Sequence, residues 1–119
     1  MEMNRCILIG RIVRDLSLHN LESGSRVINN VLAINRLTKS SGKQTADFIP
    51  FVAWGRKAEL LDQYCKKGDQ VALEGRLQSR SYETKDKEVR YVVELNVDNI
   101  QFLQNKKEEV DLLKELAKK

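Results

Sequence analysis

Between residues 70 and 102, apolar and polar side chains alternate with a period of two, and this alternation constrains the fold more than any other feature of the chain. Successive side chains of a β-strand point to opposite faces, so the pattern predicts long strands with one buried and one exposed face. The first run covers residues 70–83, and the second begins at residue 89 and changes register near residues 98–99. In the first run, Val71, Leu73, Gly75 and Leu77 are predicted to face the core, and Glu74, Arg76, Gln78, Arg80 and Tyr82 to face away from it.

Shorter signals predict three more strands and a helix. Apolar or β-branched segments indicate strands at residues 3–13, 27–36 and 46–54. Residues 56–67 change to a helical period and end in two lysines followed by Gly68. This ending predicts a helix with a basic last turn and a glycine stop.

The order of three strands, one helix and two strands predicts an all-β fold. A five-stranded Greek-key barrel with a helix between strands three and four is the OB-fold. A Rossmann-type fold would need repeated alternation of strands and helices, which the chain lacks. Pro50 cannot donate a ladder hydrogen bond, so strand three should be irregular, bulged or at an edge there. We expect an OB-fold domain over residues 1–103 and a short, charged, amphipathic C-terminal helix over residues 104–119, packed on the barrel or a partner subunit, with a frayed appendage as the alternative.

Composition favours a single-domain protein of the cytoplasm. The 119 residues suit one domain, and 41% hydrophobic residues can fill one core. No apolar run approaches the roughly 18 residues of a membrane helix, and charged residues among the first 14 argue against a signal peptide. The two cysteines are far apart and form no Cys-x-x-Cys pair, which fits a reducing compartment. A net charge of +4 leans modestly toward polyanionic partners.

Aromatic and basic side chains are predicted to share the outward faces of neighbouring strands. Phe48 and Trp54 have the same parity in one strand, and Arg80 and Tyr82 share a parity in another. An exposed ring beside guanidinium groups is a platform for an unpaired base, because every base has a face that can stack. Basic residues nearby would neutralise phosphates. The candidate nucleic-acid-binding residues are therefore Phe48, Trp54, Tyr82, Arg36, Lys39, Arg56, Arg76 and Arg80.

These residues also have a plainer structural interpretation. Aromatic side chains in strands usually belong to the core, and arginines on a strand face are usually solvated. Ile49 and Phe51 have the opposite parity and can fill the core, which leaves Phe48 and Trp54 free to be exposed unless a subunit contact covers them. Tyr91 is assigned to the core or to an interface.

The chain offers little for catalysis, so no enzyme activity, cofactor or metal is expected. His19 is the only histidine, and it has no second ligand at metal spacing. The six glycines are scattered singly and form no phosphate-binding loop. The predicted barrel segment also lacks the clustered acidic residues with which a nuclease holds magnesium.

Five segments carry a family resemblance: residues 4–12 (NRCILIGRI), 32–36 (LAINR), 46–59 (ADFIPFVAWGRKAE), 66–68 (KKG) and 74–82 (EGRLQSRSY). In this order and spacing they resemble the bacterial single-stranded DNA-binding proteins, over residues 3–103. The resemblance implies a homotetrameric OB-fold protein that binds and protects single-stranded DNA, without sequence preference, during replication, recombination and repair.

The same resemblance assigns individual roles. The three aromatic candidates stand where the family stacks bases. Thr38 stands near the place of a further stacking tryptophan of some members, so Arg36 and Lys39 are expected to hold the backbone there instead. The chain stops at Lys119, without the long linker and acidic tip by which many members recruit other proteins. It therefore looks like the compact versions found on phages, on plasmids or as secondary paralogues, and would meet replication or recombination proteins through another surface.

Two further functions remain open from the residues alone. The exposed rings could form a partner contact of an OB-fold protein-interaction adaptor. The stacking platforms and phosphate contacts would equally serve a single-stranded RNA, because they do not distinguish the sugars.

Overall fold

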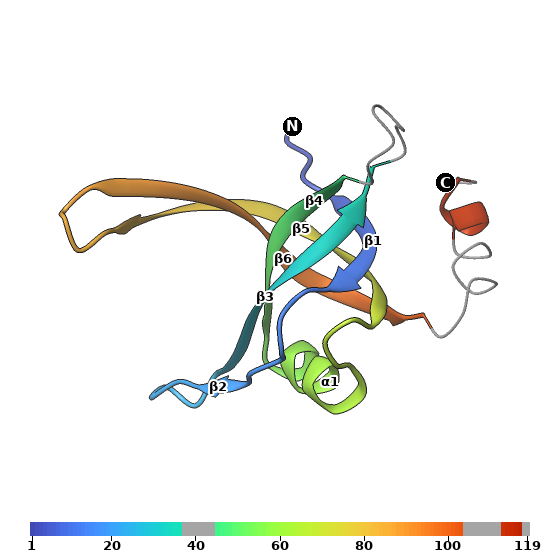
Figure 1. Cartoon of the computed structure of the whole chain (residues 1–119), viewed down its shortest axis with the longest axis horizontal. Coiled ribbons are helices and arrows are strands. Elements are labelled where there is room, and N and C mark those ends of the chain that lie inside the picture. The colour runs from blue at the N-terminus through green and yellow to red at the C-terminus, as the bar shows by residue number, and fades with distance from the viewer. Residues whose placement is uncertain (37–44, 104–112, 118–119) are drawn as a thin grey trace.

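The structure is a computed structural model that describes residues 1–36, 45–103 and 113–117 (Figure 1). Residues 6–102 contain six strands and one helix. In chain order they are β1 (Cys6–Ile12), β2 (His19–Asn20), β3 (Arg26–Asn35), β4 (Ala46–Trp54), α1 (Arg56–Tyr64), β5 (Gln70–Glu83) and β6 (Val89–Phe102). Residues 113–117 are also helical.

The five long strands close into a barrel, which confirms the predicted OB-fold. The strand order is β1-β5-β6-β4-β3-β2, and β1 also pairs with β3 through Arg11 and Ile12. That second pairing joins the two sides of the sheet. α1 lies between the third and fourth long strands, as predicted, and it covers one end of the barrel (Figure 1). The two-residue strand β2 was not predicted from the sequence.

The core fills the inside of the barrel with the side chains that the alternation assigns to it. Ile28 and Leu32 of β3 and Leu73 of β5 are completely buried. Phe51 points inward from β4 and is 1% exposed, as its parity predicts. α1 contributes Leu61 to the same cluster, so the helix is held by apolar contact with the barrel.

The register change predicted near residues 98–99 is a bulge of β6. Glu74 pairs with Asn99, whereas the next residue, Gly75, pairs with Val97, so Asp98 is the extra residue. The backbones approach closely here: a Cβ added to Gly75 would lie 2.0 Å from the backbone oxygen of Asn96. Glycine is therefore required at this position by space.

Gly75→Ala is expected to lower the free energy of unfolding by about 3 kcal/mol, because the clash is with a backbone oxygen of the paired strand, which cannot move without breaking the ladder. Denaturant unfolding measures the loss. Gly24→Ala is the control: Gly24 has a positive φ of 89° but open space around it, so only the conformational cost of about 1 kcal/mol is expected. An equal loss in the two variants would contradict the assigned clash.

The helix ends earlier than predicted. α1 stops at Tyr64, Cys65 is extended, and no basic residue lies in the last turn. The cause is a tight turn in which the side chain of Asp69 accepts a hydrogen bond from the Lys66 backbone N–H at 3.0 Å. Gly68 lies in that turn with a φ of 91° rather than at the helix end. Burial, with a smaller contribution from Asp69, raises the pKa of the Cys65 thiol to about 11.

Pro50 causes no bulge in its strand. It pairs with Val31 in an unbroken β3–β4 register. On its other side β4 pairs with β6 only at Phe51 and Val52. Pro50 therefore lies at a free edge of β4. An edge position was one of the three possibilities predicted for it.

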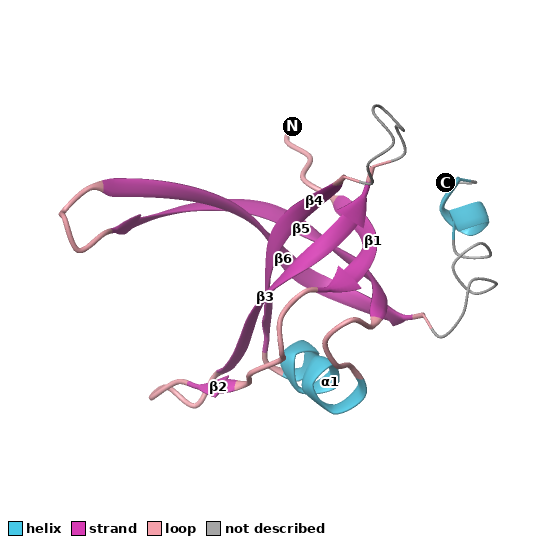
Figure 2. Ribbon diagram, in the orientation of Figure 1, coloured by secondary structure: helices cyan, strands magenta, loops and turns pink. Residues whose placement is uncertain are grey.

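The last part of β5 and the first part of β6 leave the barrel as a long two-stranded arm (Figure 2). Leu77, which was predicted to face the core, is 43% exposed because β5 leaves the barrel at this point. Beyond it every residue of β5 is exposed. The arm extends to the same side of the molecule as the β2–β3 hairpin (Figure 1).

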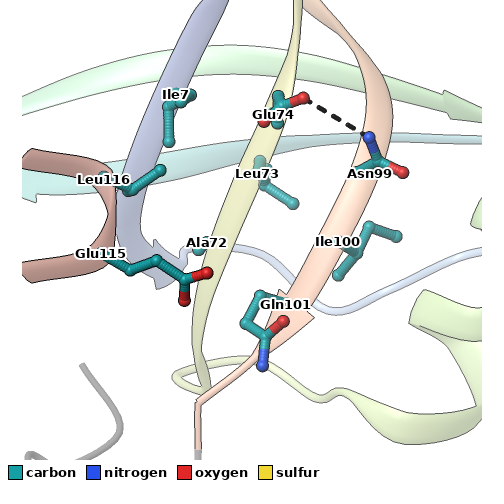
Figure 3. A pocket seen from close by; sticks show the side chains of 9 residues that line it. All are labelled: Ile7, Ala72, Leu73, Glu74, Asn99, Ile100, Gln101, Glu115 and Leu116. Atoms are coloured by element: carbon teal, nitrogen blue, oxygen red, sulfur yellow. Dashed lines mark hydrogen bonds between the residues drawn. The ribbon is translucent and has the colours of Figure 1, made fainter. Parts of the chain in front are cut away.

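The described part of the C-terminal segment, residues 113–117, lies beside the outer face of β1 and β5 (Figure 3). Leu116 points toward Ile7 of β1, and the two side chains help to line a hollow of about 240 Å³. The helix predicted there is present in these residues, which are exposed except for the partly buried Leu116. Glu115 and Leu116 line the hollow together with residues of the barrel. The division of the chain at residues 103 and 104 stays a prediction.

Candidate nucleic-acid interface

Two aromatic rings lie bare on the outer face of the β3–β4 ladder. Phe48 pairs with Ala33 and Trp54 with Val27, so both rings are on the face opposite Phe51. Phe48 is 61% exposed and Trp54 is 41% exposed. Trp54 follows Phe48 by six positions, so at roughly 3.3 Å per residue the two rings are about 20 Å apart along the strand. The sequence-based expectation that these rings face outward is confirmed for both.

A groove runs across the sheet beside Trp54. One hollow of about 480 Å³ adjoins a second of about 250 Å³, and Asn29, Arg80 and Glu94 line both of them. We call the pair of hollows the Trp54 groove. Its walls come from β3, β4, β5 and β6, from the turn after β2 and from Arg14, which follows β1. The first hollow is lined by Leu21, Val27, Asn29, Val52, Trp54, Gln78, Arg80 and Glu94.

Arg80 links the groove to the third predicted ring. Its Nε donates a hydrogen bond to Oε1 of Glu94 at 2.9 Å. Its guanidinium carbon lies 5.9 Å from the centre of the Tyr82 ring, within the range of a cation–π contact. Tyr82 is 48% exposed on the arm. Arg80, Tyr82 and Trp54 therefore follow one another along a single surface.

The other predicted arginines are also ion-paired, and their guanidinium groups remain exposed. Arg36 binds Asp47 at 2.8 Å, which lowers the pKa of that carboxyl group, mainly through the hydrogen bond. The remaining two pairs are Arg56 with Glu59 at 3.3 Å and Arg76 with Asp98 at 3.4 Å. None of these three arginines is among the residues that line the two hollows of the Trp54 groove. Lys39 lies outside the described residues.

Several groove residues were missed in the sequence. Glu94 is only 8% exposed although it is charged. Arg14 lines the second hollow, and its backbone N–H and C=O are both bonded by the buried side chain of Asn30 at 3.1 and 3.0 Å. Asn29 and Leu21 complete the lining. The sequence does not reveal that Arg80 and Glu94 pair, because their contact depends on the register between β5 and β6.

The described residues contain no group of three or more His, Cys, Asp or Glu side chains that could hold a metal ion. In the same part of the chain, no helix is long and apolar enough to cross a membrane.

Comparison with known proteins agrees with this geometry. The model of the single-strand binding protein family matches residues 3–103. A single-stranded DNA-binding protein of Clostridium tetani is 45% identical over 103 residues, which are 86% of this chain and 71% of that protein. Single-stranded DNA-binding protein 1 of Staphylococcus aureus is 42% identical over 105 residues, 87% of this chain and 67% of that protein.

A solved structure has the same fold. The Plasmodium falciparum SSB in complex with ssDNA superposes with a TM-score of 0.77 at 24% identity, over 87% of this chain and 97% of that one. The family match over residues 3–103 and the two relatives show that the chain belongs to the single-strand binding protein family.

Proposed function

We propose that this protein binds and protects single-stranded DNA by stacking unpaired bases on Trp54, Tyr82 and Phe48. The observation that supports the proposal is the exposure of all three rings: Phe48 and Trp54 share the outer face of β4, and Tyr82 lies beside Arg80, which lines the groove with Trp54. Each base stacked on a ring contributes about 1–3 kcal/mol, whatever its sequence. Family membership supports a binding protein rather than an enzyme, with a role in replication, recombination and repair.

The phosphates would be met by Arg36, Arg56, Arg76 and Arg80, with Lys39 as a further candidate. Because each of these arginines already has a carboxylate partner, a phosphate must replace that partner or share the guanidinium with it. A guanidinium has five N–H donors, so sharing is possible without breaking the pair. The carboxylates therefore weaken the attraction of this surface for the backbone.

Asp47→Asn is expected to tighten binding to an oligo-dT by about two- to fivefold at low salt, because Arg36 loses its competing carboxylate. Fluorescence anisotropy of a labelled oligonucleotide measures the change, which should shrink as salt increases. Asp62→Asn is the matched control, since Asp62 is exposed on α1 and its removal changes the net charge equally. Equal tightening by the two variants would show that only net charge matters.

The proposed function is tested by competition. A labelled dT oligonucleotide is bound by the purified protein, and unlabelled single-stranded DNA, RNA or duplex DNA is added. We expect displacement by single-stranded DNA and little by the duplex, whose bases are already stacked. Equal displacement by RNA would favour a general single-strand binder, and retention of a protein partner without any oligonucleotide binding would favour the adaptor.

We also propose that the protein acts as a homo-oligomer, a tetramer by resemblance to its family, in the cytoplasm of a bacterium or a phage-infected host. The arm supports this, because Val89, Tyr91 and Val93 share one face of β6 and are 58%, 79% and 56% exposed. Tyr91 is thus not a core residue, and an interface is the expectation that remains for it. Light scattering of the purified protein should give a multiple of the 13.7 kDa chain mass, and a monomer mass would contradict the proposal.

A further inference from the structure

The arm joins the barrel at the residue pair Leu77–Leu95, and its two strands are held there in different ways (Figure 2). Leu95 of β6 is completely buried and also pairs with Phe51 of β4. β5 has β1 as its other neighbour, but the last residue pair between these two strands is Cys6 with Gly75. Main-chain pairing on the β5 side therefore ends two residues before the arm begins.

The side chain of Asn4 continues the β1–β5 ladder where the main chain of β1 stops. Its Nδ2 donates a hydrogen bond to the Leu77 backbone oxygen at 2.7 Å, and its Oδ1 accepts one from the Leu77 backbone N–H at 2.9 Å. In the antiparallel register of Cys6 with Gly75, residue 4 stands opposite Leu77. A carboxamide carries the same kinds of donor and acceptor as a peptide group. Asn4 therefore makes the pair of hydrogen bonds that a strand residue would make at this place.

These two hydrogen bonds fix the direction of β5 as it leaves the barrel. Every residue of β5 from Arg76 onward is exposed, so burial does not hold this part of the strand. Tyr82 lies five residues beyond Leu77, which is about 16 Å at roughly 3.3 Å per residue. A change of about 10° in direction at Leu77 would therefore move the Tyr82 ring by about 3 Å. The distance between this ring and the rings on β4 thus depends on how firmly Leu77 is held.

We propose that Asn4 is a positioning residue for single-stranded DNA binding, which holds the arm so that Tyr82 can stack a base of the same strand that is stacked on β4. The proposal deepens the proposed function and rests on it. Asn4 acts through Leu77 and needs no contact with DNA itself. Its amide is neutral, so its removal should leave the dependence of affinity on salt unchanged, in contrast to the loss of an arginine that binds phosphate.

A double-mutant cycle tests this role with oligo-dT and fluorescence anisotropy. Asn4→Ala should weaken binding about threefold in the wild-type protein and equally in the Phe48→Ala variant, but should have no further effect in the Tyr82→Ala variant, whose ring is already absent. Asn99→Ala is the matched control: it removes a side-chain hydrogen bond to Glu74 at 3.5 Å within the barrel, and should leave the affinity unchanged. An equal loss in the Phe48→Ala and Tyr82→Ala backgrounds would overturn the proposal, and so would a Tyr82→Ala variant that binds as tightly as the wild-type protein.

Hydrogen exchange measures the contact between Asn4 and Leu77 in the wild-type protein without any variant. The Leu77 amide should be protected, whereas the Ser79 amide, which by alternation faces the same edge of β5 beyond Asn4, should exchange quickly. In Asn4→Ala the Leu77 amide should exchange about fivefold faster, with no change at Leu73 in the barrel. Equal exchange of Leu77 and Ser79 in the wild-type protein would overturn the positioning role and leave the proposed function intact. A wild-type protein that fails to bind oligo-dT would instead contradict the proposed function.

Discussion

Replacing Trp54 by alanine is expected to weaken binding of single-stranded DNA by roughly 5- to 150-fold, the range of about 1–3 kcal/mol for one lost base stack. The ring is 41% exposed on the outer face of β4, and the core behind it is filled by Phe51 rather than by Trp54. The fold should therefore survive the change. Anisotropy titration measures the loss of affinity, and the thermal unfolding midpoint reports on the fold.

Two variants control for this result. Trp54→Phe keeps a flat ring and should retain most of the affinity. Tyr64→Ala removes a ring that is 61% exposed on α1, away from the groove, and should leave binding unchanged. If Trp54→Ala unfolds the protein, or if it binds as well as Tyr64→Ala does, then the ring is a structural element and not a stacking platform.

Arg80→Ala is expected to have a second large effect, because it removes a cation from the groove and also leaves the carboxylate of Glu94 without its partner. Without Arg80, the unpaired carboxylate of Glu94 would repel the phosphates of the bound strand, and losing a charged contact to a binding partner typically costs about 2 kcal/mol or more. Because 55% of the Arg80 side chain remains exposed, the lower end of that range applies. We expect binding to weaken about 20- to 30-fold.

The comparison with Arg90→Ala separates the two contributions. Arg90 lies on the same arm, and its carboxylate partner, Glu88, is 61% exposed, so only a cation is lost there. The double variant Arg80→Ala/Glu94→Gln should recover much of the affinity that Arg80→Ala loses. If Arg80→Ala is no more harmful than Arg90→Ala, then the burial of Glu94 has no effect on binding.

The individual strands and the outward rings were predictable because both follow from a local rule. Side chains alternate along a strand, so the burial of Phe51 implies that Phe48 and Trp54 lie on the opposite face. The bulge at Asp98 was also visible, as a break in the alternation. These features depend on the order of residues within one strand and need no knowledge of how the strands pair.

The groove was not predictable for the opposite reason. Arg80 and Glu94 meet because β5 and β6 pair in one particular register, and Asn29 joins them only after the barrel closes. Likewise, the end of α1 at Tyr64 depends on the turn made by Asp69, although the lysines and glycine beyond it suggested a longer helix. Long-range pairing and local turn hydrogen bonds were decisive where periodicity gave no information.

We propose above all that the exposed ring of Trp54 on β4 takes up unpaired bases from a charged strand. Trp54 is the single tryptophan of the chain, so its fluorescence reports on this one place. Titration with oligo-dT at low salt should quench the emission to a saturating level, and added salt should restore it, because phosphate contacts weaken as counterions are supplied. Unchanged emission at low salt, with oligo-dT in excess over the protein, would contradict the account.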